Sequence, residues 1–214
     1  RRDMPDMRRF ARRTEAFREV GPELTELEPD LPGFSKGLFF EGEAHLDPRK
    51  ALHDLYKGLQ AKGVPFHRKP APSGLKNAID CRGLHACDTL NDLRGVKGEM
   101  LVIRCPDVSL SRPVRLLHPR IPLYIVPRGD GIYMLGATMI ESEDSSRITA
   151  RSMLELLSAA YALNPAFGEA EVLEIGVDLR PAFPDNLPRI RRLGHTIYAN
   201  GLYRHGYLLA PAVA

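Results

Sequence analysis

The pattern of apolar and polar positions in the first half of the chain predicts one well-defined helix. The apolar residues that recur at helical spacing are Leu52, Leu55, Tyr56 and Leu59. Asp47 is a suitable N-cap, Pro48 fits the first helical position, and Gly63 is typical of a helix end. We therefore expect a helix between these residues, followed by a short strand over 64–66.

Weaker patterns flank this helix on both sides. Residues 4–17 follow a helical repeat, whereas 22–32 are rich in proline and predict an irregular connection. Residues 76–83 predict a strand that ends in a glycine turn. Together with the central helix and its following strand, these elements indicate an αβ unit of the nucleotide-binding type.

Strand patterns dominate from Gly95 onward. The β-rich runs are 98–104, 123–126 and 132–136, and the sequence Pro-Arg-Gly-Asp-Gly between the last two predicts a hairpin turn. Thr149 can cap a helix, and 171–179 alternates as a returning strand. The predicted apolar face of that helix consists of Met153, Leu156, Leu157, Ala160 and Tyr161. We expect a mixed α/β fold in which an antiparallel sheet is flanked by a helix.

Composition and charge are those of an ordinary globular protein. The 214 residues, 43% of them hydrophobic, can bury one large or two small cores. A formal net charge of +3 is too small to predict nucleic-acid binding. The basic cluster near the N-terminus is interleaved with acidic residues and is interpreted as a solvated helix face; it consists of Arg1, Arg2, Arg8, Arg9, Arg12 and Arg13.

The cysteines and the hydropathy of the chain indicate whether it binds a metal and in which cellular compartment it resides. Cys81, Cys87 and Cys105 form an odd set without the spacing of a metal site. No stretch approaches the ~20 apolar residues of a membrane span, and no signal sequence is recognised. We expect a cytoplasmic protein without bound metal or membrane contact. Whether it forms a homo-oligomer stays open.

Two arginines at the ends of apolar segments are candidates for binding an anion. Arg180 follows an alternating strand pattern and precedes Pro181, while Arg204 lies in a turn between Gly201 and Gly206. Guanidinium groups bind carboxylates through two parallel hydrogen bonds. The residues therefore suggest a carboxylate site, although a structural role for a strand-end arginine stays open on sequence alone.

Four segments of the second half carry a family resemblance when they are taken in order. They are Tyr-Ile-Val-Pro-Arg at 124–128, Gly-Ala-Thr-Met at 136–139, Leu-Arg-Pro at 179–181, and Gly-Leu-Tyr-Arg-His-Gly-Tyr-Leu-Leu-Ala-Pro at 201–211. As a set they resemble the D-amino-acid-oxidase-like family of FAD-dependent oxidoreductases, in particular its glycine oxidases of thiamine (thiazole) biosynthesis. The likeness runs from residue 94 to the C-terminus and continues more weakly over 43–64.

The resemblance implies a domain arrangement and a cofactor, FAD. Residues 1–94 and 181–214 would be the remainder of an FAD-binding Rossmann-like domain, and 95–180 would be an antiparallel-sheet substrate domain. The fingerprint G-x-G-x-x-G, which holds the dinucleotide pyrophosphate at a helix N-terminus in such enzymes, does not occur in these residues. We therefore expect that the chain is part of a longer protein.

The resemblance also implies roles for individual residues. Arg180 would bind the carboxylate of the substrate, Tyr124 would donate a hydrogen bond to the same anion, Arg204 would lie beside the substrate, and Met139 would form an apolar wall. The residues implied to line the isoalloxazine ring of FAD are Leu202, Tyr203, Arg204, His205, Gly206, Tyr207 and Leu208. Amide donors at this position stabilise the anion of a reduced flavin.

No acid–base residue is assigned by the resemblance. Pro122 stands where a histidine would be expected two residues before the tyrosine, and His118 and His205 are interpreted as structural or exposed. Amine oxidation by hydride transfer requires a deprotonated amine and an aligned Cα–H more than a protein base. No nucleophile elbow, P-loop or metal motif is present in the sequence.

The activity that the resemblance implies is oxidation of glycine or a similarly small amine. A hydride would pass from Cα to N5 of FAD, and the imine would give glyoxylate and ammonia or enter thiazole assembly. O2 would reoxidise the flavin and yield H2O2. Two alternatives stay open: a sarcosine or D-amino-acid oxidase, and a non-catalytic fragment that lacks the dinucleotide-binding segment.

Overall fold

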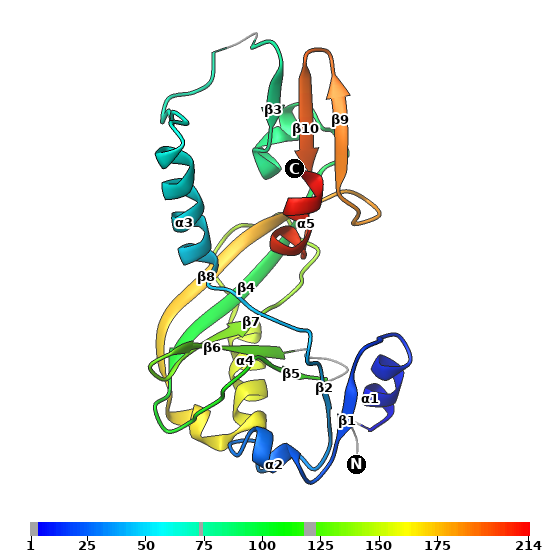
Figure 1. Ribbon diagram of the computed structural model, residues 1–214, viewed down its shortest axis with the longest axis vertical. Coiled ribbons are helices and arrows are strands. Elements are labelled where there is room, and N and C mark those ends of the chain that lie inside the picture. Colours follow the sequence, from blue (N-terminus) through cyan, green and yellow to red (C-terminus); the bar gives the residue numbers. More distant parts are fainter. Residues whose placement is uncertain (1–3, 73–74, 118–122) are drawn as a thin grey trace. The chain divides into compact units, whose positions relative to one another are not determined.

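The computed structural model describes residues 4–72, 75–117 and 123–214 (Figure 1). By contacts the chain divides into two units. The first unit comprises Arg1–Leu52, Glu99–Thr138 and Ile148–Gly176. The second unit comprises His53–Gly98, Met139–Arg147 and Val177–Ala214. The domain boundaries expected from the sequence remain a prediction.

A five-stranded sheet dominates the first unit. Its strands, in spatial order, are β5 (Val114–Leu116), β6 (Leu123–Gly129), β7 (Ile132–Gly136), β4 (Arg94–Arg104) and β8 (Glu171–Ala182). β5, β6, β7 and β4 pair antiparallel in that order. β4 and β8 also contribute residues to the second unit. The predicted antiparallel sheet, and with it the mixed α/β class, is confirmed.

The β6–β7 turn has the geometry that its sequence predicts. Asp130 and Gly131 join the two strands, and both have positive φ angles, 52° and 68°. An Asp-Gly pair with two left-handed residues is typical of a type I′ turn, whose twist matches that of the flanking strands. A register shift between Pro127 and Gly129 adds a bulge just before the turn.

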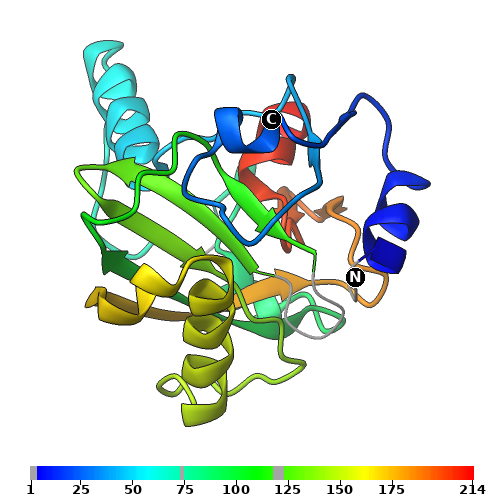
Figure 2. The ribbon, with the colours of Figure 1, turned by 90° about the horizontal axis from the view of Figure 1, so that it is seen from below.

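Helix α4 (Ala150–Leu163) covers one face of this sheet (Figure 2). The hydroxyl of Thr149 accepts a hydrogen bond from the amide of Ser152 at 3.2 Å, so the predicted N-cap is confirmed. Leu156 and Ala160 are buried against the sheet as expected. Tyr161 was expected on the same face but is 55% exposed, because it lies on the opposite side of the helix from the core.

The core between α4 and the sheet is continuous and almost entirely aliphatic. Its buried strand residues are Leu101, Ile103, Leu123, Ile125, Tyr133 and Leu135. These positions are two apart along their strands and therefore face the same side. The short helix η2 (Pro165–Glu169) adds Phe167, whose ring meets Tyr133 edge-on at a centroid distance of 5.4 Å.

The N-terminal segment contributes small elements to the first unit. These are α1 (Met4–Ala11), β1 (Arg18–Val20), α2 (Leu24–Leu27) and β2 (Gly37–Phe39), and β1 pairs antiparallel with β2. The helix expected over 4–17 ends at Ala11, where the Thr14 hydroxyl bonds to the Phe10 carbonyl at 3.0 Å. A side chain that bonds a nearby carbonyl competes with continuation of the helix. The described arginines of the basic cluster are exposed: Arg8, Arg9, Arg12 and Arg13.

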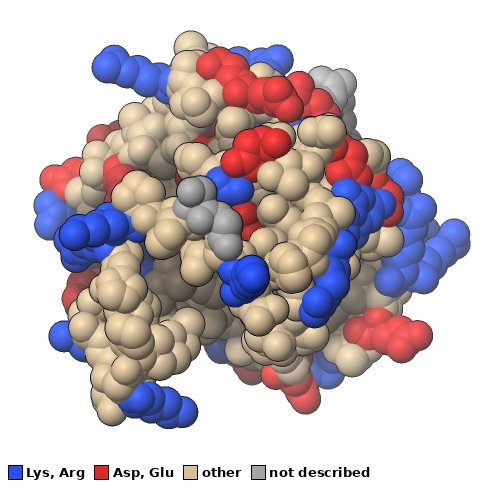
Figure 3. All heavy atoms as spheres, turned by 90° about the horizontal axis from the view of Figure 1, so that it is seen from above, with Lys and Arg blue, Asp and Glu red and all other residues tan. Residues whose placement is uncertain are grey.

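Charged side chains of both signs are interspersed with uncharged surface on the face drawn in Figure 3. This distribution accompanies the small net charge of +3. In the described part of the chain, no helix is long and apolar enough to cross a membrane.

The second unit contains a smaller sheet of mixed direction. β10 (Thr196–Asn200) pairs in parallel with β3 (Ala78–Asp80) and antiparallel with β9 (Arg189–Leu193). The 3-10 helix η1 (Gly83–Asp88) follows β3, and α5 (Gly206–Val213) follows β10. One face of this sheet meets a small core formed by Ala86, Leu90, Leu93 and Phe183, with Leu84 and Tyr198 beside it.

The other face of the β3–β10–β9 sheet is largely apolar, with Arg192 as its charged member, and two of its isoleucines are well exposed. Ile79 is 68% and Ile190 is 60% exposed, and both share a face with Ile197, which is paired directly with Ile79. Sheets with parallel strands are normally covered on both faces. The described residues thus leave one face of a parallel pair uncovered.

Helix α3 (Pro48–Ala61) confirms the clearest prediction of the first half. Asp47 accepts a hydrogen bond from the amide of Lys50 at 2.8 Å, and Gly63 has a positive φ of 76°. Leu52 and Leu55 are exposed in the described structure. The strand expected over 64–66 is not formed, because this extended segment has no pairing strand among the described residues.

We predict that Thr149→Ala lowers the free energy of unfolding by about 1 kcal/mol, because the first turn of α4 loses its side-chain cap. Thr149→Ser retains the hydroxyl and is the matched control, with a loss well below that of the alanine variant. Urea unfolding followed by circular dichroism measures both. Equal losses in the two variants would mean that the threonine methyl, not the cap, is the stabilising group.

Candidate functional site

Arg180 lies near the end of β8, within the second unit, and is half-buried. Its guanidinium lies over Gly98 of β4: a Cβ built on Gly98 would fall within 3.0 Å of the Arg180 Cζ and both Nη atoms. The three atoms are nearly equidistant from that position, so the planar group faces the glycine. The strand backbone therefore contacts the flat side of the guanidinium.

The turn after β10 is tied to the chain just beyond Arg180. The amide of Tyr203 donates to the Pro181 carbonyl at 3.1 Å. The Asn200 side chain donates to the Gly83 carbonyl at 2.8 Å and accepts from the amide of Gly201, also at 2.8 Å. These bonds hold the 201–205 turn, which carries several predicted site residues, next to the end of β8.

The buried ring of Phe183 packs against this turn. Phe183 is fully buried, and a Cβ on Gly201 would fall within 3.0 Å of its ring. The guanidinium carbons of Arg189 and Arg191 each lie 4.6 Å from the ring centroid. Such cation–π contacts favour a fixed ring position.

A bidentate ion pair fixes one of these two arginines. Arg191 donates to both carboxylate oxygens of Asp92 at 2.7 and 2.6 Å. These hydrogen bonds hold the pKa of Asp92 below its ordinary value. Sequence reasoning missed this cluster, because its members come from segments about a hundred residues apart that share no motif.

Met139 and Tyr203, two of the predicted site residues, are brought together. The Tyr203 hydroxyl donates to the Met139 sulfur at 3.6 Å, and both residues belong to the second unit. Tyr203 has a positive φ of 47°, in the left-handed region that residues other than glycine rarely adopt. A residue predicted to contact substrate thus meets one predicted to contact the cofactor.

Tyr124 belongs to the first unit, where it is half-buried on β6. It is paired across the sheet with Gly136, and a Cβ there would fall within 3.0 Å of the phenol Cζ and Oη atoms. The ring therefore lies on bare backbone.

Arg204 is exposed in its turn, and His205 at the α5 N-cap position is also exposed.

A buried carboxylate organises the segment that follows β7. Glu99 has no exposed surface; it accepts from the Thr138 hydroxyl at 2.9 Å and from the amide of Thr149 at 3.3 Å. The Thr138 amide also bonds to the Glu99 carbonyl at 3.1 Å. These bonds fix the residue immediately before Met139, and no pattern in the sequence indicated this role.

The residues predicted to line the isoalloxazine ring form the turn and the first turn of α5. His205 supplies no side-chain cap to the helix. The first amides of any α-helix make no intrahelical hydrogen bond, and they carry the positive end of the helix dipole. The first turn of α5 can accordingly donate hydrogen bonds to an electron-rich edge of a ligand. His118 and Pro122 lie outside the described residues.

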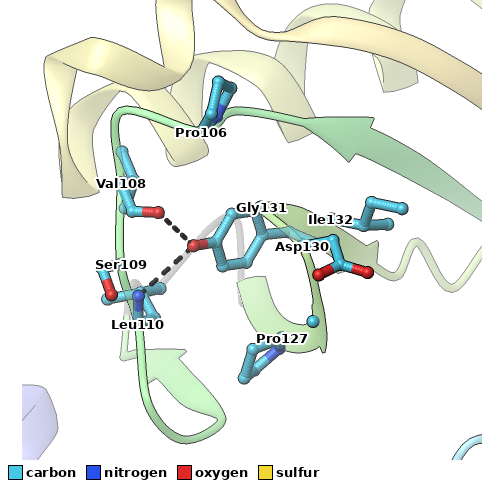
Figure 4. A pocket seen from close by; sticks show the side chains of 10 residues that line it. Pro106, Val108, Ser109, Leu110, Pro127, Asp130, Gly131 and Ile132 are labelled. Atoms are coloured by element: carbon cyan, nitrogen blue, oxygen red, sulfur yellow. Dashed lines mark hydrogen bonds between the residues drawn. The ribbon is translucent and has the colours of Figure 1, made fainter.

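A surface pocket of about 290 Å³ lies beside the β6–β7 hairpin in the first unit (Figure 4). The Tyr133 hydroxyl donates to the Val108 carbonyl there and accepts from the Leu110 amide at 3.3 Å. The predicted site residues do not line this pocket. The Tyr133 hydroxyl on its wall is engaged in holding the 108–110 loop.

Metal chemistry is not indicated in the described part of the chain, where no group of three or more His, Cys, Asp and Glu side chains could hold an ion. Cys81 and Cys87 are exposed thiols, and Cys105 is buried. Burial raises the pKa of the Cys105 thiol.

Comparison with known families identifies the class of protein to which the chain belongs. The sequence profile described as FAD dependent oxidoreductase (DAO) matches residues 1–214. The chain therefore belongs to the FAD dependent oxidoreductase family. The predicted oxidoreductase class and its cofactor, FAD, are confirmed by this membership.

Two individual relatives indicate which members of this family the chain resembles in sequence. The chain is 53% identical over 220 aligned positions to the thiamine biosynthesis oxidoreductase ThiO assigned in Rhizobium etli, covering 100% of this chain and 67% of that protein. It is 34% identical over 120 positions to a glycine oxidase of Pseudomonas putida, covering 55% of this chain and 32% of that enzyme. The resemblance expected from the sequence is confirmed.

Solved structures agree on the fold. A glycine oxidase from Bacillus cereus superposes with a TM-score of 0.78 at 20% identity, covering 99% of this chain and 67% of that one. At this identity the likeness shows the fold alone. The chain spans about two thirds of the length of the Rhizobium etli protein and of the Bacillus cereus enzyme.

We predict that Gly201→Ala destabilises the second unit more than Gly194→Ala does. Both glycines have positive φ angles, 80° and 59°, so each alanine incurs backbone strain of about 1–3 kcal/mol. Only the methyl at 201 meets the Phe183 ring, since nothing lies within 4 Å of one at 194. Urea unfolding of both variants gives the difference, and identical losses would show that the ring yields without cost.

Proposed function

We propose that the complete protein is an FAD-dependent oxidase of glycine or a similarly small amine in thiazole and thiamine biosynthesis. The observation that carries the proposal is the half-buried Arg180 at the end of β8, whose neighbour Pro181 is hydrogen-bonded to the 201–205 turn. The 53% identity to the Rhizobium etli protein supports the pathway, and the Pseudomonas putida relative supports glycine as substrate.

Arg180 is the proposed ligand of the substrate carboxylate. A small amino acid has one permanent anion, and a planar fork of N–H donors fixes its orientation as well as its position. Tyr124 keeps its proposed role as a hydrogen-bond donor to the carboxylate, and Arg204 as a second cation beside the substrate. Met139 is the proposed apolar wall, supported by its contact with Tyr203.

The described residues fit part of an FAD site. The first turn of α5, which His205 does not cap with its side chain, offers amide donors suited to the pyrimidine edge of a flavin. When bound, FAD would supply the oxidising power, as an acceptor of the hydride from Cα that O2 would reoxidise with formation of H2O2. The chain's own residues orient the amine, and the products we propose are the imine, or glyoxylate and ammonia.

The proposed domain arrangement assigns 1–94 and 181–214 to the FAD-binding domain and 95–180 to the substrate domain. The parallel β3–β10 pair with one uncovered apolar face supports the first assignment, because such sheets are normally covered on both sides. A non-catalytic fragment is the competing interpretation. The gene sequence upstream of Arg1 discriminates between the two, since the oxidase requires a G-x-G-x-x-G segment there.

The central test of the proposed function is Arg180→Ala in the full-length protein. Truncating one partner of a buried bidentate carboxylate pair costs about 2–5 kcal/mol, so the KM for glycine should rise roughly 30- to several-thousand-fold. The FAD content should stay unchanged, because the substitution leaves the cofactor contacts in place. Oxygen consumption at varied glycine gives KM. The exposed Arg151→Ala serves as control, and wild-type kinetics in Arg180→Ala would remove Arg180 from the site.

Substrate size distinguishes a glycine oxidase from a sarcosine or general D-amino-acid oxidase. If Met139 crowds the space beside the substrate Cα, glycine and sarcosine should react faster than D-alanine. Each methylene in an apolar pocket is worth about 1–3 kcal/mol, so we expect a graded series. Met139→Ala should shift the kcat/KM ratio toward D-alanine. Equal rates for glycine and D-phenylalanine in the wild-type protein would instead support the general oxidase.

A further inference from the structure

We propose that Gly98 is a positioning residue for Arg180. The inference rests on the proposed function, because it assigns to Gly98 the task of holding the carboxylate-binding guanidinium in a fixed orientation. Both residues belong to the second unit. The proposal concerns a position in the middle of a strand, where glycine is normally disfavoured because it adds chain entropy to the unfolded state and packs no side chain.

The backbone of Gly98 does not itself require glycine. Its φ lies outside the left-handed range, unlike those of Gly83, Gly131 and Gly201, so an L-residue can adopt its conformation without strain. What sets this position apart is the space above it. A Cβ would fall within 3.0 Å of three guanidinium atoms of Arg180.

The atoms in that space are the functional end of the arginine. The other glycine in β4, Gly95, has the aliphatic side chain of Leu179 as its neighbour, at 3.2 Å from a built Cβ. At Gly98 the neighbour is instead the planar charged group. Two glycines on one strand thus face two consecutive residues of β8, and only one faces the predicted carboxylate ligand.

Stacking on a glycine leaves the guanidinium in a geometry suited to a carboxylate. A bidentate pair uses the N–H groups at the edge of the guanidinium plane, whereas the backbone of Gly98 contacts its flat side. The bare strand therefore limits rotation of the plane without competing for the same donors. The guanidinium is held in orientation before the substrate arrives, which is the condition for efficient positioning.

A methyl at position 98 should displace the guanidinium and leave the fold intact. The end of an arginine side chain is flexible, so it can move away from a new Cβ more easily than backbone or a rigid ring can. Gly136 is a less suitable position for the same test, because there the neighbour is the rigid ring of Tyr124. The expected effect of Gly98→Ala is consequently on substrate binding and not on folding.

Four variants of the full-length oxidase test the proposal: Gly98→Ala, Gly95→Ala, Arg180→Ala and the double variant Gly98→Ala with Arg180→Ala. Displacing a positioning group by about 1 Å costs up to roughly 100-fold, so Gly98→Ala should lower kcat/KM for glycine about 10- to 100-fold, mainly through KM. Gly95→Ala carries the same methyl on the same strand and should keep the wild-type KM. FAD content reports the folded fraction of each.

The double variant separates positioning from a general structural role. If Gly98 acts only through Arg180, the alanine at 98 should change kcat/KM less than about twofold once Arg180 is already alanine. A further loss in that background would overturn the proposal. The proposal would also be overturned if Gly98→Ala and Gly95→Ala had the same KM for glycine although Arg180→Ala raised it. Wild-type kinetics in Arg180→Ala would instead remove the proposed carboxylate site itself.

A binding measurement covers the case in which Gly98→Ala lowers the yield of folded protein. The Kd of acetate, obtained from perturbation of the flavin spectrum, reports only on molecules that hold FAD. It should rise about 10- to 100-fold in Gly98→Ala and stay unchanged in Gly95→Ala. An unchanged acetate Kd in Gly98→Ala, together with a raised one in Arg180→Ala, would overturn the positioning role.

Discussion

Close contact between functional or supporting side chains and bare backbone is the constraint on which the candidate site depends. Gly98 faces the Arg180 guanidinium, Gly136 faces the Tyr124 ring, and Gly201 faces the Phe183 ring. In each case a single added carbon would occupy the space of the neighbouring group. Interiors are packed densely enough that such a carbon must displace something. Three residues without side chains therefore determine where three larger ones lie.

The sequence predicted the elements whose signals are local. The helices beginning at Pro48 and Ala150 carry their own caps, and the Asp-Gly hairpin turn needs only two residues to specify its geometry. Predictions that depended on a distant partner were wrong in two places. The strand over 64–66 needs a neighbour that the described residues do not supply, and Tyr161 follows the helical repeat without facing the core.

The same distinction applies to the candidate site. The arginine before Pro181 and the glycine-flanked turn could be singled out from the sequence because their motifs are contiguous. Glu99, Asp92 and Gly98 could not, since each acts on a residue many positions away and none has an unusual local context. A glycine in a strand signals a close approach, but only the structure identifies the group that approaches.

The parallel pairing of β3 with β10 has a consequence for how the protein is made. The bond from Asn200, the last residue of β10, to Gly83, which lies just after β3, spans 117 positions of sequence. The β6–β7 hairpin, by contrast, closes through two turn residues. Contacts of long sequence separation form more slowly, because closing the long loop between them costs conformational entropy before the contact repays it. On the ribosome, the hairpin can form early, while the β3–β10 sheet must wait until Asn200, the last residue of β10, has emerged.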